Sequence, residues 1–226
     1  MKKILITGAN SYIGTSFENY IRKNFSETYA VDTVDMIDGN WREKSFAGYD
    51  SVFHVAGIAH RKETRETAHL YYEVNCDLAI ETADKAKKEG VKQFIFLSSM
   101  SVYGKNTGTI TKETPIIAKS NYGKSKVEAE KGILALQNTE FQVAILRPPM
   151  IYGKECKGNY QALVKLALKF PFFPYVKNQR SMLYIENLCE FVRLILDSGE
   201  SGLFCPQNAE YSNTSEMVKM IAKAHG

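Results

Sequence analysis

Hydrophobic residues alternate along the chain between short continuous runs and helix-like spacing. Continuous apolar runs predict strands at 2–7, 29–36, 51–56, 92–99 and 141–147. Apolar residues at three- and four-residue intervals predict helices at 13–24, 71–89, 122–137 and 214–226. Strands that are apolar throughout and alternate with helices indicate an α/β fold, a Rossmann-type doubly wound parallel sheet. In such a sheet, ligands bind beyond the carboxyl ends of the strands.

The pattern loosens after Arg147, where two Pro-containing stretches interrupt it, "PPMIYGKECKGNY" and "KFPFFPYVKNQRS". We therefore expect a Rossmann domain over 1–150, followed at 151–226 by a small second lobe whose elements are interleaved with the last elements of the sheet.

Composition narrows the class of protein. The chain has 226 residues, 44% hydrophobic and 24% charged, which suits one globular domain with a small appendage. No run reaches signal-peptide or membrane-spanning length, so we expect a cytoplasmic protein without a membrane partner. The cysteines are widely spaced, which predicts reduced thiols and no metal site. A net charge of +4 fits an anionic small ligand, and we expect no nucleic-acid partner.

The stretch "ITGANSYIG" places Gly8 and Gly14 between a predicted strand and a predicted helix. Backbone N–H groups and the helix dipole can hold a diphosphate at such a turn, with Tyr12 and Ile13 beside it. Ser11 occupies the middle position, where a glycine is usual, and its hydroxyl is available to a phosphate oxygen. The turn alone fits an ordinary strand-to-helix connection equally well.

Two acidic residues lie near the end of the second predicted strand, Asp32 and Asp35. Asp35 is the first choice for binding the ribose hydroxyls of a dinucleotide, and a solvated strand charge is the preferred interpretation of Asp32. An acid at this place favours NAD over NADP, because a 2′-phosphate meets a like charge.

The stretch "SNYGKSKVEAEKGI" carries Tyr122 and Lys126 four residues apart in a predicted helix, with Ser120 or Asn121 as the N-cap. Residues at this spacing share one helix face. They therefore act on one ligand or are two ordinary surface side chains.

The motifs "TGANSYIG", "VFHVAG", "LSSMSVYG" and "NYGKSK" occur in the order found in a known family. Together they resemble extended short-chain dehydrogenases/reductases, specifically the NAD-dependent nucleotide-sugar epimerase/dehydratase family of the UDP-glucose/UDP-galactose 4-epimerase type. The resemblance runs from Lys3 to about Leu196. It implies NAD as cofactor, a nucleotide-sugar substrate, a role in polysaccharide biosynthesis and a homodimer, whose two long helices, 71–89 and 122–137, pair with their symmetry mates.

The resemblance also implies a catalytic set of Ser99, Tyr122 and Lys126. Tyr122 exchanges a proton with the substrate hydroxyl, and Ser99 orients that hydroxyl. Lys126 hydrogen-bonds the nicotinamide ribose, and its ammonium is expected to lower the pKa of Tyr122 toward neutrality. Ser98 is expected to be a strand-end hydroxyl satisfied by the backbone.

The resemblance implies roles for further individual residues. Ala56 and Gly57, with Val55, let the cofactor lie against a strand end; Asn75 braces the site; Pro148 shapes the nicotinamide pocket. Asn40 and Trp41 lie where the family has an Asp-hydrophobic pair beside the adenine. On the substrate side the resemblance implies Ser101, Asn159 and Arg180, the last as a partner of the diphosphate. His54 is expected to be a packing residue.

Two departures from the family pattern limit the function. Met100 and Ser101 replace the Asp-Glu pair with which dehydratases remove water, so we expect epimerisation or reduction of a ketosugar. The chain also ends before the family's second phosphate-binding arginine, which predicts a substrate lobe that is truncated or abbreviated. The preferred hypothesis is an NAD-dependent nucleotide-sugar 4-epimerase acting on a UDP-hexose or UDP-N-acetylhexosamine. An NAD(P)H-dependent ketosugar or carbonyl reductase and a non-catalytic cofactor-binding regulator are the alternatives.

Overall fold

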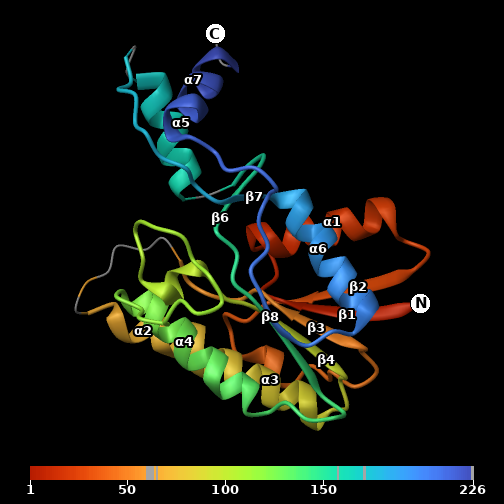
Figure 1. Cartoon of the computed structure of the whole chain (residues 1–226). Coiled ribbons are helices and arrows are strands. Elements are labelled where there is room, and N and C mark those ends of the chain that lie inside the picture. Colours follow the sequence, from red (N-terminus) through yellow and green to blue (C-terminus); the bar gives the residue numbers. More distant parts are fainter. Residues whose placement is uncertain (60–63, 65, 157, 170–171, 225–226) are drawn as a thin grey trace.

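A six-stranded parallel sheet forms the centre of the molecule in the computed structural model, which describes residues 1–59, 64, 66–156, 158–169 and 172–224 (Figure 1). The strand order is β2-β1-β3-β4-β5-β8. The strands are β1 (Lys2–Thr7), β2 (Tyr29–Val34), β3 (Ser51–His54), β4 (Gln93–Leu97), β5 (Gln142–Leu146) and β8 (Gly202–Phe204). This order changes direction at β1, so the carboxyl ends of β1 and β3 border a crevice in which doubly wound sheets bind ligands. The predicted fold class is confirmed.

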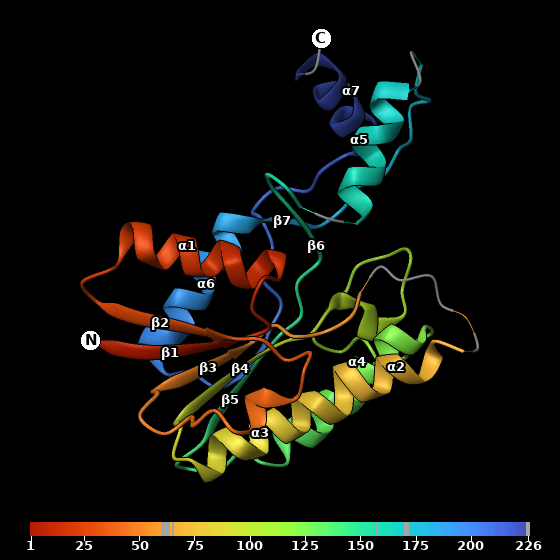
Figure 2. The same ribbon diagram turned by 180° about the vertical axis from the view of Figure 1, so that it is seen from behind.

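Helices cover both faces of the sheet (Figures 1 and 2). One face carries α1 (Tyr12–Asn24) and α6 (Ile185–Ser198), and the other carries α2 (Ala68–Tyr72), α3 (Leu78–Lys88) and α4 (Asn121–Leu134). The predicted helix at 71–89 is present as α2 and α3 joined by a π-helical segment, Glu73–Asp77. Ser120 is the N-cap of α4, since its hydroxyl accepts from the Gly123 amide at 3.1 Å.

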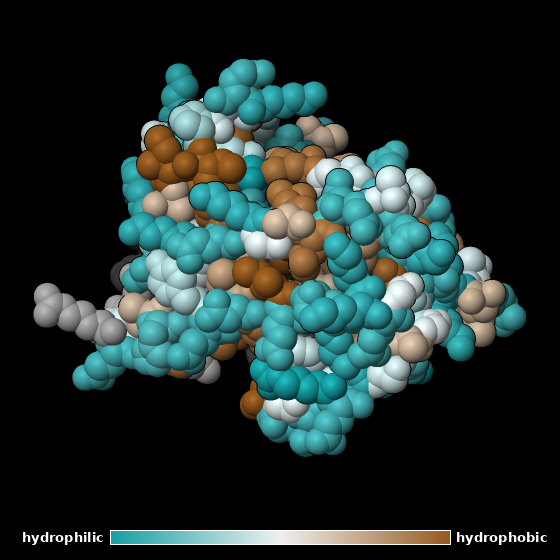
Figure 3. Space-filling model, turned by 90° about the horizontal axis from the view of Figure 1, so that it is seen from below, coloured by the Kyte–Doolittle hydropathy of each residue, from teal (hydrophilic) through white to brown (hydrophobic). Residues whose placement is uncertain are grey.

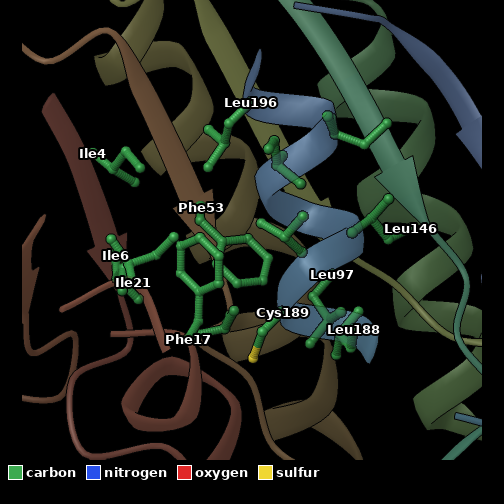
Figure 4. Close-up of a cluster of buried hydrophobic side chains, with 14 of the residues drawn as sticks. Ile4, Ile6, Phe17, Ile21, Phe53, Leu97, Leu146, Leu188, Cys189 and Leu196 are labelled. Atoms are coloured by element: carbon green, nitrogen blue, oxygen red, sulfur yellow. The ribbon is translucent and has the colours of Figure 1, made fainter. Parts of the chain in front are cut away.

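Two hydrophobic cores hold these layers together. In the core under α1 and α6, the rings of Phe17 and Phe53 meet edge to face with centroids 5.2 Å apart, beside Leu188 and Cys189 (Figure 4). The core under α3 and α4 contains Trp41, together with Phe94 and Phe96 of β4. Burying side chains of this size contributes about 1.5–3 kcal/mol each, so the strands stay in place mainly through these two layers.

The segment after β5 divides its residues between a small lobe and the sheet. The lobe contains α5 (Asn159–Lys169) and α7 (Thr214–Ala224), which pack on each other, and the two-stranded parallel pair β6 (Met150–Tyr152) and β7 (Met182–Tyr184). Between β7 and α7 the chain returns through α6 and β8, which belong to the main sheet layers (Figure 2).

The described residues contain no helix that is long and apolar enough to cross a membrane. All four cysteines are free thiols, as predicted, and Cys205 is the exposed one. The face seen from below mixes hydrophilic residues with hydrophobic patches (Figure 3).

Candidate active site

The glycine turn after β1 is held against the ends of two neighbouring strands. The amides of Gly8 and Ala9 donate to the Val34 carbonyl at the end of β2, at 2.9 and 3.0 Å. Gly8 has φ +106°, and a Cβ added there would lie 2.7 Å from the Ala56 amide nitrogen. Only glycine satisfies both conditions, because side chains disfavour this φ and the backbone of Ala56 leaves no room.

The N-terminus of α1 opens at the same turn. Ser11 is the N-cap, and its hydroxyl oxygen accepts from the Gly14 amide at 3.1 Å, so its hydrogen remains able to donate to a ligand oxygen. A Cβ on Gly14 would lie 2.8 Å from that hydroxyl oxygen. With glycine at positions 8 and 14, the backbone of this turn, in front of the N-terminus of α1, fits the diphosphate of a dinucleotide.

The two predicted ribose-binding acids occupy different places. Asp35 directly follows β2, and its carboxylate accepts from the Ile37 amide at 2.9 Å. Asp32 lies inside the strand opposite Leu5, and its carboxylate accepts from the Tyr49 hydroxyl at 2.7 Å. Since the glycine turn bonds to Val34, the residue before Asp35, the structure places Asp35 beside the turn and Asp32 away from it.

Trp41 differs from its predicted place beside an adenine. Its side chain is only 1% exposed and packs in the core against Phe46, so the ring offers almost no surface to a ligand. This corrects the prediction for Trp41: apolar burial governs its position. Asn40 is exposed, and its amide groups bond to the Asp38 carboxylate.

A cleft of about 670 Å³ lies at the carboxyl ends of β1, β3, β4 and β5. It brings together ten of the predicted site residues: Ser11, Tyr12, Ile13, Val55, Gly57, Ser99, Ser101, Tyr122, Lys126 and Pro148. These residues are distributed over most of the sequence from the first helix to the end of β5, and the sheet topology brings them to one edge. The cleft therefore joins the glycine turn to the Tyr122–Lys126 pair.

Tyr122 and Lys126 both face this cleft from α4. The Lys126 ammonium is buried, donates to the Leu97 carbonyl at 2.9 Å and lies 4.6 Å from the centroid of the Phe96 ring. Tyr122 packs edge to face on Tyr71 of α2, with centroids 6.3 Å apart. The pair is therefore part of the cleft wall and not of the outer helix surface.

The structure does not show the predicted lowering of the Tyr122 pKa by Lys126. Burial raises the pKa of the Tyr122 phenol, and its hydrogen bond with Ser99 acts in the opposite direction. The Lys126 ammonium is directed at the Leu97 carbonyl instead, and burial lowers its own pKa to about 8. In this arrangement Tyr122 is a protonated phenol.

The serines after β4 have separate partners. The Ser99 hydroxyl accepts from the Ser101 amide at 3.1 Å and donates to the Ser101 hydroxyl at 3.1 Å, and both residues line the cleft. Ser98 donates to the Glu130 carboxylate, which corrects the expectation of a backbone partner.

Asn75 braces the cleft from the π-helical segment. Its side chain is fully buried, accepts from the Ile58 amide at 2.8 Å and donates to the Ile58 carbonyl at 3.1 Å. A Cβ on Gly57 would lie 2.9 Å from the Asn75 side-chain oxygen and 3.5 Å from the Lys126 nitrogen. Asn75 and Gly57 therefore fix the loop after β3 close to Lys126.

Arg180, a predicted substrate-binding residue, is not among the residues that line the cleft. Arg180 is exposed, and its backbone pairs with Ser212 at 2.8 and 2.9 Å in the lobe. Asn159 begins α5, and its side chain lies outside the described residues. Their roles remain predictions.

His54 is buried and packs against Phe94 and Phe96, and its Nδ1 lies 2.7 Å from the Thr7 hydroxyl oxygen.

Some residues that line the cleft are not predicted from the sequence: Ile58, Ala59, Tyr71, Leu97, Met150 and Ile151. Most directly follow predicted strands, so extending each strand end by a few residues would have found them. Tyr71 lies in α2 and not after a strand, so the strand pattern does not point to it.

The fold and the cleft are those expected of a dinucleotide-binding protein, and a tyrosine and a lysine line the cleft. A family model described as "NAD dependent epimerase/dehydratase family" matches residues 4–204. The chain belongs to this family. Membership confirms the predicted cofactor, NAD, and the prediction of an NAD-dependent enzyme of the epimerase type.

Named relatives are similar over most of this chain. It is 31% identical over 248 aligned residues to a UDP-glucose 4-epimerase of Vibrio cholerae, covering 99% of this chain and 76% of the relative. It is 30% identical to the N-acetyl-alpha-D-glucosaminyl-diphospho-ditrans,octacis-undecaprenol 4-epimerase of Escherichia coli O157:H7, covering 88% of this chain and 64% of the relative.

Solved structures share the fold. A UDP-glucuronic acid 4-epimerase from Bacillus cereus, in complex with NAD, superposes with a TM-score of 0.83 at 19% identity, over 99% of this chain and 83% of the other. A dTDP-4-dehydrorhamnose reductase from Clostridium acetobutylicum superposes with a TM-score of 0.81 at 22% identity, over 99% and 80%. Epimerases and reductases thus share this fold, and the reaction has to be argued from the cleft.

Proposed function

We propose that the protein is an NAD-dependent nucleotide-sugar 4-epimerase that acts through a 4-keto intermediate. The observation that carries the proposal is the single cleft in which Tyr122, Lys126 and Ser99 lie beside the glycine turn. A family match to residues 4–204 and epimerase relatives at 30% and 31% identity support it. The substrate class is a UDP-hexose or a UDP-N-acetylhexosamine.

The side chains of the cleft have different roles in the proposed proton transfers. Bound NAD supplies the site that accepts a hydride and returns it. Ser99 and Tyr122 bind the reacting oxygen of the sugar, and Ser99 orients it. The protonated phenol of Tyr122 is the form that gives a proton to the 4-keto oxygen. Removal of the proton from the sugar hydroxyl requires the phenolate form of Tyr122. Lys126, one helical turn away, is the cation that can stabilise this phenolate once its ammonium no longer donates to the Leu97 carbonyl.

The residues after Ser99 argue against a dehydratase. Met100 lines the cleft where a dehydratase needs a carboxylic acid, and a thioether can neither give nor take a proton. Ser101 carries a hydroxyl that binds a ligand oxygen but is a poor base. The available groups therefore suit oxidation and return of the hydride at one carbon, which is what an epimerase needs.

The test is product analysis with a panel of UDP- and dTDP-sugars. We expect the NAD-loaded protein to interconvert a pair of C4 epimers, followed by the anomeric proton signals, without net formation of NADH. Net consumption of NADH or NADPH with a keto sugar would establish the alternative, a reductase. Cofactor binding without turnover of any sugar in the panel would favour a non-catalytic regulator.

We also expect NAD to bind more tightly than NADP. The Asp35 carboxylate next to the glycine turn repels a 2′-phosphate, which should weaken NADP at least roughly tenfold, or about 1.4 kcal/mol. Calorimetric titration of both cofactors measures the difference, and Asp35→Asn should reduce it. Asp32→Asn is the matched control, since the Tyr49 hydroxyl holds that carboxylate inside β2. Equal affinity for NAD and NADP in the wild type would contradict the role of Asp35.

A cytoplasmic homodimer is the assembly that we propose. Support comes from the family resemblance and from α3 and α4, which lie side by side on one outer layer and can form a four-helix bundle with a second copy. The relative named for an undecaprenol-linked sugar supports a role in polysaccharide biosynthesis. Light scattering that detects only monomer at micromolar concentration would contradict the dimer.

A further inference from the structure

A buried ion pair lies beneath the cleft, between α4 and the end of β5. Glu130 is 3% exposed and Arg147 is 4% exposed. The Arg147 guanidinium donates twice to the Glu130 carboxylate, from Nη2 at 2.5 Å and from Nε at 3.0 Å. This bidentate geometry fixes both side chains in one orientation.

The pair also holds the strand ends that form the cleft floor. Ser98, at the end of β4, donates to the same carboxylate, and the Arg147 Nη1 donates to the Tyr103 hydroxyl oxygen at 2.8 Å. Ser98 directly precedes Ser99 and Arg147 directly precedes Pro148, and both Ser99 and Pro148 line the cleft. Displacement of the pair would therefore move Ser99 and Pro148.

Glu130 lies one helical turn beyond Lys126, on the same face of α4. Other ionisable groups around the Lys126 ammonium are Tyr122 on α4 and His54 on β3, and Arg147, directly after β5, lies beyond the carboxylate. His54 is fully buried and its pKa is lowered to about 3, so it is neutral. Burial lowers the pKa of Lys126 to about 8, and the charge of Glu130 opposes this effect. The Glu130 carboxylate is thus the anion that favours the ammonium form of Lys126.

We propose that Glu130 is a positioning residue of the active site. Its carboxylate keeps Lys126 in the ammonium form. Through Ser98 and Arg147 it also fixes the ends of β4 and β5. The catalytic half of this inference rests on the proposed function, in which Lys126 acts as a cation beside Tyr122. Stability alone is a weak reason for such a pair, because buried ion pairs are often no more stable than apolar replacements.

The direct test is Glu130→Gln, which keeps the shape of the side chain and removes its charge. NMR titration of protein with 15N-labelled lysine, with the Lys126 signal assigned through Lys126→Arg, measures the Lys126 pKa without any substrate. We expect this pKa to fall by about one unit, because an attraction is lost and the Arg147 charge is left unneutralised.

Activity should show a matching change. The ammonium is the working form and is lost as the pH rises through the Lys126 pKa. A lower pKa therefore moves the alkaline limb of the pH–rate profile to lower pH by about the same amount. Glu190→Gln is the matched control, since Glu190 makes a bidentate pair with Arg193 on α6, at 2.7 Å for both bonds, away from the cleft. It should change neither the Lys126 pKa nor the profile.

Two more variants separate charge from folding. Ser98→Ala keeps the carboxylate, so the Lys126 pKa should stay in place. The double variant Glu130→Gln/Arg147→Met leaves no unpaired buried charge, which protects the fold if the single variant is unstable. The Lys126 pKa should still fall in it. An unchanged Lys126 pKa in a folded Glu130 variant would overturn the proposal, as would a fall without a change in the profile. If the Lys126 pKa falls but the protein converts no sugar, the electrostatic role of Glu130 is supported and only the proposed function is overturned.

Discussion

Tyr122→Phe should lower the epimerisation rate by at least about 100-fold while NAD affinity remains nearly unchanged. The substitution removes only the phenolic hydroxyl, which is the group that transfers the proton, and loss of general acid–base catalysis has an effect of about 10²–10⁴-fold. The aromatic ring, with its contact to Tyr71, is retained. Initial rates and calorimetric NAD titration of wild type and variant measure the two effects separately.

Tyr20→Phe is the matched control for that experiment. Its hydroxyl donates to the Glu190 carboxylate at 2.8 Å on the α1–α6 face, so the same atom is removed far from the cleft. We expect a small loss of thermal stability and wild-type turnover. Near wild-type turnover of Tyr122→Phe would contradict the proposed proton transfer.

Gly8→Ala should destabilise the protein by more than about 2 kcal/mol and abolish measurable NAD binding. The new Cβ would lie 2.7 Å from the Ala56 amide nitrogen, and the φ of +106° is unfavourable for alanine. Relief of the clash requires the turn to separate from β3, which removes the N–H groups that face the diphosphate. The thermal midpoint should fall by roughly 5 °C or more.

Gly48→Ala isolates the backbone contribution to this effect. Gly48 also has a positive φ, +83°, but a Cβ there meets nothing within 4 Å. It should cost about 1 kcal/mol and leave NAD binding intact. If Gly8→Ala resembled Gly48→Ala in both measurements, the tight contact between the turn and β3 would have no role in cofactor binding.

The first two thirds of the fold could be predicted because local pattern and tertiary environment agree there. The strand run at 92–99 is apolar because β4 contributes to the cores on both faces of the sheet, and the alternation with helices indicates the parallel sheet. The sequence analysis does not predict the helix at 185–198 or the strand at 202–204, although Ile185, Leu188 and Val192 recur at helical spacing. The preceding Pro-containing stretches interrupt the pattern and indicate a second lobe instead.

The candidate site divides in a similar way. The glycine turn and the Tyr122–Lys126 spacing are local features, so the sequence shows them directly. The burial of Trp41 and the direction of the Lys126 ammonium depend on residues distant in sequence. The Glu130–Arg147 pair cannot be predicted from the sequence either, because the sequence does not distinguish a buried charged residue from an exposed one.

The most direct test of the proposed epimerisation follows an isotope on the sugar. A UDP-hexose carrying deuterium at C4 is incubated in ordinary water with the NAD-loaded protein, and both epimers are analysed by NMR and mass spectrometry. The proposed function predicts that the C4 epimer forms with deuterium still at C4, because the hydrogen that leaves this carbon returns to it without exchange with solvent. Formation of the epimer with hydrogen at C4, or of a keto product with net NADH and no epimer, would contradict it.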